Sequence, residues 1–266
     1  MPPRFVLVLL LVLGLPPSPL LSAAPDALAQ AAALYDAKRV PEAREQLAAL
    51  VDREPKNVRA LHLLGLCELK MQRYDDSAAT FARAVKLAPD DHALLADYGS
   101  ACLLRADQLG TSFRAIGFAR RGRAALEEAV AISPDTVAYR EGLIQFYTRA
   151  PIFAGGSFSR AYAHIDEIAK RDPIRGAVIR AHVLSADGRH AEALAACEAV
   201  LADHPDSYLA LYTLGRIAAD TGQNLDRGEA AFRRCLELTP RIEEPAHALV
   251  RQHLARLLEK SAEARK

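Results

Sequence analysis

The sequence predicts an all-α fold in which pairs of helices stack one after another into a solenoid. Prolines recur at intervals of 34, 45, 39, 32 and 35 residues, which is typical of a repeat array. Apolar residues between them are spaced by three and four, and no stretch shows the sustained alternation of a strand. The composition, 51% hydrophobic and 25% charged, is that of a folded domain, and 266 residues can bury a sizeable core. The recurring prolines are Pro55, Pro89, Pro134, Pro173, Pro205 and Pro240.

Residues 1–24 are predicted to be a secretory signal peptide. Arg4 gives a basic start, an apolar run of 11 residues covers 5–15, and prolines and small residues follow. A membrane-spanning helix needs about 20 apolar residues, so this run is too short. An uncleaved anchor and a buried helix are the alternatives, and cleavage is expected after Ala24 or at residues 27–29. The mature chain, residues 25–266, is therefore expected in the periplasm or outside the cell, with no membrane insertion after cleavage.

Each predicted unit is a pair of short helices that ends near one of the prolines, because proline lacks the N–H needed to continue a helix. A final helix, over residues 243–262, has a polar face that suits the end of a stack. The units cover about residues 25–57, 58–91, 92–136, 137–173, 174–207 and 208–241.

Two units depart from the others. The distance from Gly99 to Pro134 is 35 residues, whereas Gly65 to Pro89 is 24, so the third unit is predicted to be a lengthened helix pair that turns near residues 110–112. The fourth unit contains a loop over residues 150–156 that ends in two glycines. No Lys-Ser/Thr follows these glycines, so we interpret the loop as an insertion and not as a phosphate-binding loop.

Two units carry a common pattern that resembles the tetratricopeptide repeat family. One reads Leu61-x-x-Leu64-Gly65-x-x-Glu68, with Ser77, Phe81, Ala84 and Pro89. The other reads Leu211-x-x-Leu214-Gly215-x-x-Ala218, with Gly228, Phe232, Cys235 and Pro240. The resemblance covers about residues 26–240 and implies a right-handed α-solenoid of about six such units, with a capping helix at its end. A weaker likeness, through the long third unit and the loop after it, is to exported bacterial members of the family.

The resemblance implies a non-catalytic scaffold that binds a peptide or protein segment in a concave groove lined by the first helix of each pair. An accessory subunit of an envelope or transport assembly is the alternative, and an enzyme is the third hypothesis. The family's clamp for chaperone carboxylates needs Lys and Asn where this chain has His62, Leu66 and Asp97, which argues against that ligand. The implied groove residues are Arg59, His62, Asp97, Glu141, Gln145, Arg149, His182, Tyr212 and Arg216.

Little else in the sequence indicates chemistry. The formal net charge of +1 gives no bulk attraction to nucleic acid or to an anionic membrane, and no cofactor, metal or catalytic motif is found. Of the four cysteines, we favour packing roles over a bridge, and Cys67 with Cys102 is the most plausible disulfide because they lie on neighbouring first helices. Arginines at 105, 114, 120, 121 and 123 form either a solvated face or a docking patch for an acidic partner.

Overall fold

The computed structural model describes residues 26–242 and 244–264, and it is built from helices. The predicted signal peptide, residues 1–24, lies outside the described residues. Within those residues there are thirteen α-helices, one short 3-10 helix and no strand. The helices are α1 (Ala27–Asp36), α2 (Val40–Arg53), α3 (Val58–Lys70), α4 (Tyr74–Leu87), α5 (His92–Leu109), α6 (Phe113–Ile132), α7 (Val137–Arg149), η1 (Ile152–Ala154), α8 (Phe158–Ala169), α9 (Pro173–Ala186), α10 (His190–Asp203), α11 (Tyr208–Thr221), α12 (Leu225–Glu237) and α13 (His247–Ala264).

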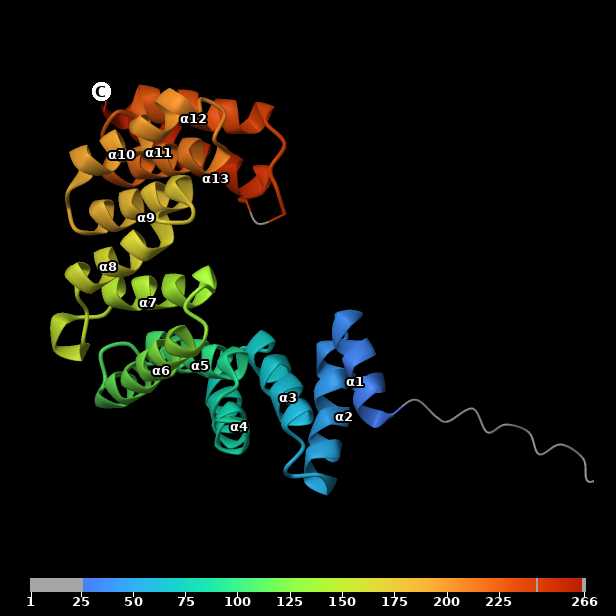
Figure 1. Cartoon of the computed structure of the whole chain (residues 1–266). Helices are drawn as coiled ribbons and strands as arrows, with labels where there is room; N and C mark the ends of the chain where they lie inside the picture. The colour runs from blue at the N-terminus through green and yellow to red at the C-terminus, as the bar shows by residue number, and fades with distance from the viewer. Residues whose placement is uncertain (1–25, 243, 265–266) are drawn as a thin grey trace, which may run out of the picture.

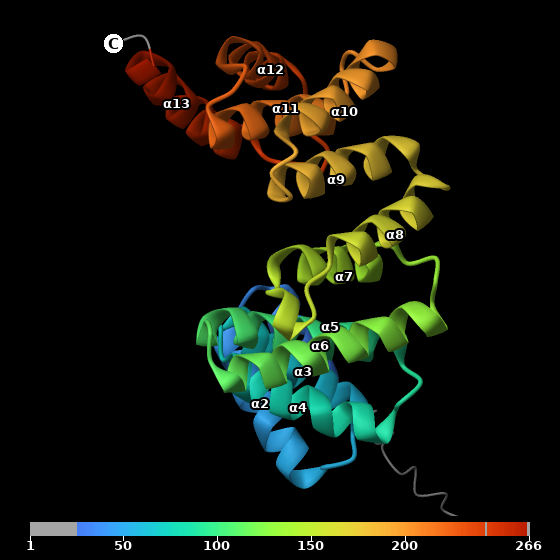
Figure 2. The same cartoon turned by 90° about the vertical axis from the view of Figure 1, so that its left-hand side faces the viewer.

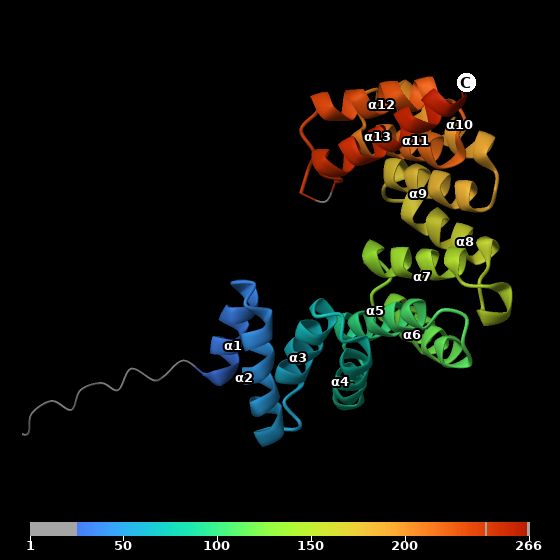
Figure 3. The same ribbon diagram turned by 180° about the vertical axis from the view of Figure 1, so that it is seen from behind.

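The helices form consecutive pairs that stack along a curved path, with α1 and α13 near its two ends (Figure 1). Each α-helix packs mainly on the ones before and after it in the chain. The same arc is seen from behind in Figure 3, and the side view in Figure 2 shows that successive pairs are rotated against one another. This arrangement confirms the predicted all-α solenoid.

Short polar side chains start several of the helices. Asn57 caps α3 by accepting a hydrogen bond from the backbone N–H of Ala60 at 3.0 Å. Asp91 caps α5, where its carboxylate accepts from the N–H groups of residues 93 and 94. Ser112 and Ser157 do the same for α6 and α8. These caps satisfy N–H groups that have no partner inside a helix, so they fix where each helix begins.

Two repeats pack a phenylalanine directly against a glycine. Phe81 and Phe232 are fully buried. A Cβ atom built on Gly65 would lie 2.7 Å from the Phe81 ring, and one built on Gly215 would lie 2.7 Å from the Phe232 ring. The glycines therefore let the second helix of each pair approach the backbone of the first. The buried apolar side chains form three large clusters that follow one another along the solenoid and one small cluster between α9, α10 and α11.

The third pair is longer than the others, as the insertion predicts. Its helices, α5 and α6, have 18 and 20 residues, and Gly110 ends α5 with a φ of +62°. The two backbones come close where Gly99 faces Gly122, because a Cβ on either glycine would lie within 3.0 Å of the other's carbonyl oxygen. The lengthened pair therefore projects past its neighbours while it remains packed along its length.

The last helix, α13, begins later than predicted. It starts at His247 instead of residue 243, and two hydrogen bonds hold Glu244 and Pro245 ahead of it. The Glu244 carboxylate accepts from the backbone N–H of Arg241 at 2.7 Å, and the Tyr208 hydroxyl donates to the carbonyl oxygen of Pro245 at 2.6 Å. Within α13 the buried apolar residues are Val250, Leu254 and Leu257, which pack against the C-terminal core.

Candidate binding groove

The first helices of the pairs form the inner side of the curve. Contacts join α1 to α3, α3 to α5, α5 to α7, α9 to α11 and α11 to α13. The second helices contact mainly their neighbours in the chain. First helices that touch across successive pairs are closer together than the second helices, so the stack curves toward them. Side chains on this side are the candidates for a concave binding surface.

In the N-terminal part of this surface, His62 of α3 and Asp97 of α5 lie together. The His62 Nε2 atom is 2.7 Å from an Asp97 carboxylate oxygen, and the His62 ring also meets the edge of Phe81. Arg59, one turn earlier on α3, is exposed. The structure therefore brings His62 and Asp97 together, although they are 35 residues apart in the chain.

In the middle of the surface, Glu141 of α7 binds Arg175 of α9 through two parallel hydrogen bonds of 2.7 and 3.0 Å. Such a paired geometry is the strong form of a carboxylate–guanidinium contact. Gln145 is exposed on α7. Arg149, at the end of α7, donates instead to the Asp107 carboxylate of α5 at 3.2 Å, which ties the ends of these two helices together.

In the C-terminal part, His182 of α9 lies 3.0 Å, through Nε2, from the hydroxyl of Thr213 on α11. Burial, together with the nearby positive charge of Arg216, lowers the pKa of His182 to about 3. The Arg216 Nε atom is buried and has no hydrogen-bond partner in the described part of the chain. Tyr212 is only 8% exposed, and its ring packs edge-on against both Phe232 and His253, which stack on each other. Its burial argues against the direct partner contact that the repeat pattern implied for it.

A groove of about 840 Å³ opens between α7, α9 and the start of α11. Its lining combines apolar side chains, among them Ile174, Val178 and Leu209, with polar ones such as Glu141 and His182. The connection between α10 and α11, and the one between α12 and α13, complete the rim. The lining contains five carboxylates and two arginines. Glu141 is paired with Arg175 and Asp206 with Arg234, so Asp172, Asp203 and Glu244 are the lining carboxylates without an ion pair in the described part of the chain.

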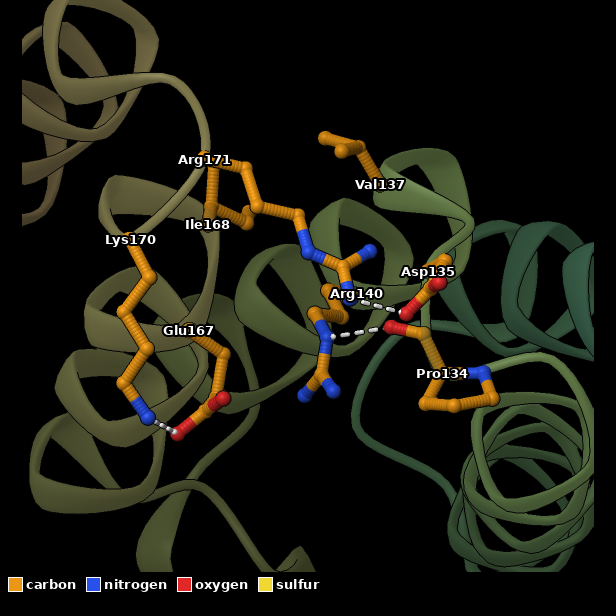
Figure 4. A pocket seen from close by; sticks show the side chains of 8 residues that line it. All are labelled: Pro134, Asp135, Val137, Arg140, Glu167, Ile168, Lys170 and Arg171. Atoms are coloured by element: carbon orange, nitrogen blue, oxygen red, sulfur yellow. Dashed lines mark hydrogen bonds and ion pairs between the residues drawn. The ribbon is translucent and has the colours of Figure 1, made fainter.

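A smaller hollow of about 240 Å³ lies where the α6–α7 and α8–α9 connections meet (Figure 4). Its charged side chains are already paired: Lys170 donates to Glu167 at 2.5 Å, and Arg171 forms an ion pair with Asp135. The Arg140 side chain donates to the carbonyl oxygen of Pro134 at 3.1 Å. The Arg171–Asp135 pair fastens the two connections to each other, and the other two contacts are local to each side, so we take the larger groove as the candidate site.

The four cysteines are buried free thiols, and no bridge joins Cys67 to Cys102. Burial raises the pKa of these two thiols to about 11, and the pKa values of Cys197 and Cys235 to about 12. A thiol that resists ionisation is a weak nucleophile and a poor metal ligand, so these residues serve as small packing groups.

Two further features bear on other functions. The described residues contain no group of three or more His, Cys, Asp or Glu side chains arranged to hold a metal ion. In the same part of the chain, every helix is too short or too polar to cross a bilayer.

Several groove residues could not be found from the repeat pattern. Arg175 lies on a first helix, but the implied positions did not include it, and its ion pair with Glu141 shows that it shapes the groove. Leu238, Arg241 and Glu244 enter the lining from the connection before α13. No repeat pattern covers that connection, so only the three-dimensional arrangement reveals it.

The stacked helix pairs and their concave groove define a helical repeat protein of the scaffold type. The tetratricopeptide repeat family model matches residues 28–103 and 180–241, more than half of the sequence. The chain belongs to the tetratricopeptide repeat family. No curated protein matches the sequence.

Solved structures show the same fold. A tetratricopeptide repeat protein from Parabacteroides merdae is 12% identical, with a TM-score of 0.59, over 87% of this chain and 97% of its own. A thermophilic protein of the family from Thermus thermophilus is 15% identical, with a TM-score of 0.53, over 88% of this chain and 97% of its own. At these identities the likeness concerns the fold. The family is one of protein–protein interaction scaffolds, and this chain has that architecture along its described length.

Proposed function

We propose that this chain is an exported, non-catalytic scaffold that holds a segment of a partner protein in its concave groove. The observation that carries the proposal is the groove itself, whose lining holds the apolar side chains of Ile174, Val178 and Leu209 together with more carboxylates than arginines. An extended or helical segment can place apolar side chains in such a groove. Since carboxylates outnumber arginines in the lining, the favoured partner segment carries lysine or arginine beside its apolar anchors.

Selection from a phage-displayed library of random peptides, with the chain from residue 25 onward as bait, tests this proposal. We expect the selected peptides to combine apolar and basic residues. Ile174→Lys together with Asp203→Lys should weaken their binding at least about tenfold, about 1.4 kcal/mol, because these changes place two positive charges in the lining of the groove. Asp52→Lys is the matched control, because Asp52 is exposed on α2 and does not line the groove. Acidic peptides, or equal binding to all variants, would refute the proposed groove.

Export is proposed from the basic start, the 11-residue apolar run and the small residues that follow it. Mass spectrometry of the protein recovered from its native compartment tests it. We expect the mature N-terminus near residue 25 or residue 30, and a chain that retains residues 1–24 in the cytoplasmic fraction would contradict export.

A further inference from the structure

Four large apolar side chains of the described residues are 70% or more exposed, and three of them lie in the middle of the chain. Phe113 is 95% exposed, Ile152 is 90% exposed and Phe153 is 70% exposed. Apart from Ile242 in the connection before α13, the other exposed large hydrophobic residues of the described chain reach only 36–42%. Single exposed apolar residues are ordinary on a protein surface, whereas several that lie near one another indicate an interaction surface.

The three side chains belong to neighbouring parts of the solenoid. Phe113 is the first residue of α6, directly after the turn of the long pair, whereas Ile152 and Phe153 lie in η1 after α7. The hydrogen bond between Arg149 and Asp107 ties the end of α7 to the end of α5 beside that turn, and η1 contacts α6. Figures 1 and 2 both show η1 beside the N-terminal half of α6.

The first of these segments is basic, and the second carries one arginine, Arg160, which lies 4.0 Å from the Glu127 carboxylate. Residues 110–126 and 150–165 together contain five arginines and no aspartate or glutamate. Arg123 pairs with Glu127, and Arg121 lies over the Phe118 ring, 4.4 Å from its centre. Arg114 and Arg120 are exposed and form no ion pair within the described residues. We call the surface formed by Phe113, Arg114, Arg120, Ile152 and Phe153 the apolar–basic edge.

We propose that the apolar–basic edge docks on the surface of a lipid bilayer that contains anionic lipid. Apolar side chains that enter the interfacial layer leave water, and arginines beside them meet headgroup phosphates, so the two attractions act at the same depth. The side chains project from a helix start and a short 3-10 segment. A fluid bilayer receives projecting side chains without a matching pocket, whereas a protein partner must supply one, and this difference favours lipid. Such docking is peripheral, because it requires no spanning helix.

The apolar–basic edge does not include groove residues, so the protein can bind a partner segment in its groove while it is docked on a membrane surface. The first test is cosedimentation of the chain from residue 25 onward, which contains every described helix, with vesicles. We expect binding to an equal mixture of phosphatidylcholine and phosphatidylserine, weaker binding at high salt, and little binding to phosphatidylcholine alone. Binding to neither kind of vesicle, or equal binding to both, would overturn the proposal.

Matched variants locate the contact. Replacing Arg114 and Arg120 by Gln should lower the partition coefficient about 25-fold, since each arginine near an anionic surface contributes about 1 kcal/mol. The same change at Arg83 and Arg251, which are exposed on α4 and α13, should leave partitioning unchanged. Likewise, Ile152→Ser with Phe153→Ser should reduce binding at least about tenfold. If the control pair has the larger effect, the edge is not the contact.

The absence of tryptophan from the sequence provides a direct readout. Phe113→Trp creates a single tryptophan whose emission should shift to the blue, and become quenched by brominated lipid, when anionic vesicles are added. Leu258→Trp, on the outer part of α13, should show neither change. If the Phe113→Trp protein sediments with vesicles while its emission remains that of tryptophan in water, the proposed edge is refuted. Loss of an acidic protein partner in the edge variants, without vesicle binding by the wild type, would assign the edge to a protein interface instead.

Discussion

The contact between Gly65 and Phe81 provides a sharp test of the packing within a repeat. A methyl group added at position 65 would lie 2.7–2.8 Å from three atoms of the Phe81 ring. Since carbon atoms normally approach no closer than about 3.5 Å, the ring must retreat by about 1 Å. Phe81 is fully buried, so its retreat disturbs the neighbouring side chains. Gly65→Ala therefore overpacks the core between α3 and α4.

The expected magnitude is the difference between two effects. Overpacking of a well-filled core costs about 1–3 kcal/mol. Alanine is a better helix former than glycine by about 1 kcal/mol, which offsets part of that cost. Gly117→Ala in the exposed face of α6 isolates the second effect, because nothing lies within 4 Å of a Cβ atom there. We expect Gly117→Ala to stabilise the protein by about 1 kcal/mol and Gly65→Ala to lie about 1–3 kcal/mol below it.

Urea unfolding followed by circular dichroism measures both variants, and hydrogen exchange in α3 and α4 reports the local effect, because a change in a repeat array acts first on its neighbours. In a Phe81→Leu background the ring is gone, so Gly65→Ala should behave more like Gly117→Ala. Equal stabilisation by the two alanines in the wild-type background would refute the close contact between the helices.

Three further predictions concern titration and thiols. Burial lowers the pKa of His182 to about 3 from its usual 6.5, so the stability that depends on its neutral form is complete above pH 6.5 and falls as the pH drops toward 3. In that range His182→Gln should reduce the change of the free energy of unfolding with pH by up to about 1.4 kcal/mol per pH unit. Burial raises the pKa of Glu68 above 4.5, so the wild type should lose stability relative to Glu68→Gln as the pH rises from acid to neutral, measured by the same urea titration. A thiol reagent at mildly alkaline pH should react only slowly with the native protein. In urea without reductant the same reagent should modify four thiols per chain, whereas modification of only two would indicate a Cys67–Cys102 bridge.

The sequence was sufficient for the repeating parts of the fold, where local pattern and packing agree. Gly65 with Phe81, and Gly215 with Phe232, stand at repeat positions, and their contacts in space follow from helix pairing. The hydrogen bond from the Tyr208 hydroxyl to the carbonyl oxygen of Pro245, just before α13, could not be predicted, because it joins residues 37 apart in the chain. The pairing of Glu141 with Arg175 was also hidden, because it depends on how far two first helices are rotated against each other.

The parts of this chain that depart from the repeat are the ones that distinguish it from other stacks of helix pairs. The family model leaves residues 104–179 unmatched, and this span contains the tip of the α5–α6 pair and the η1 loop. In a solenoid each repeat needs only its neighbours for stability, so an insertion that keeps those contacts is free to carry other side chains. The span keeps them: Gly99 still faces Gly122, while Phe113 and Ile152 project into solvent. These exposed aromatic and aliphatic groups add little to packing there, and the proposal for them is independent of the repeat core, which is why the vesicle experiment has priority over further study of the core.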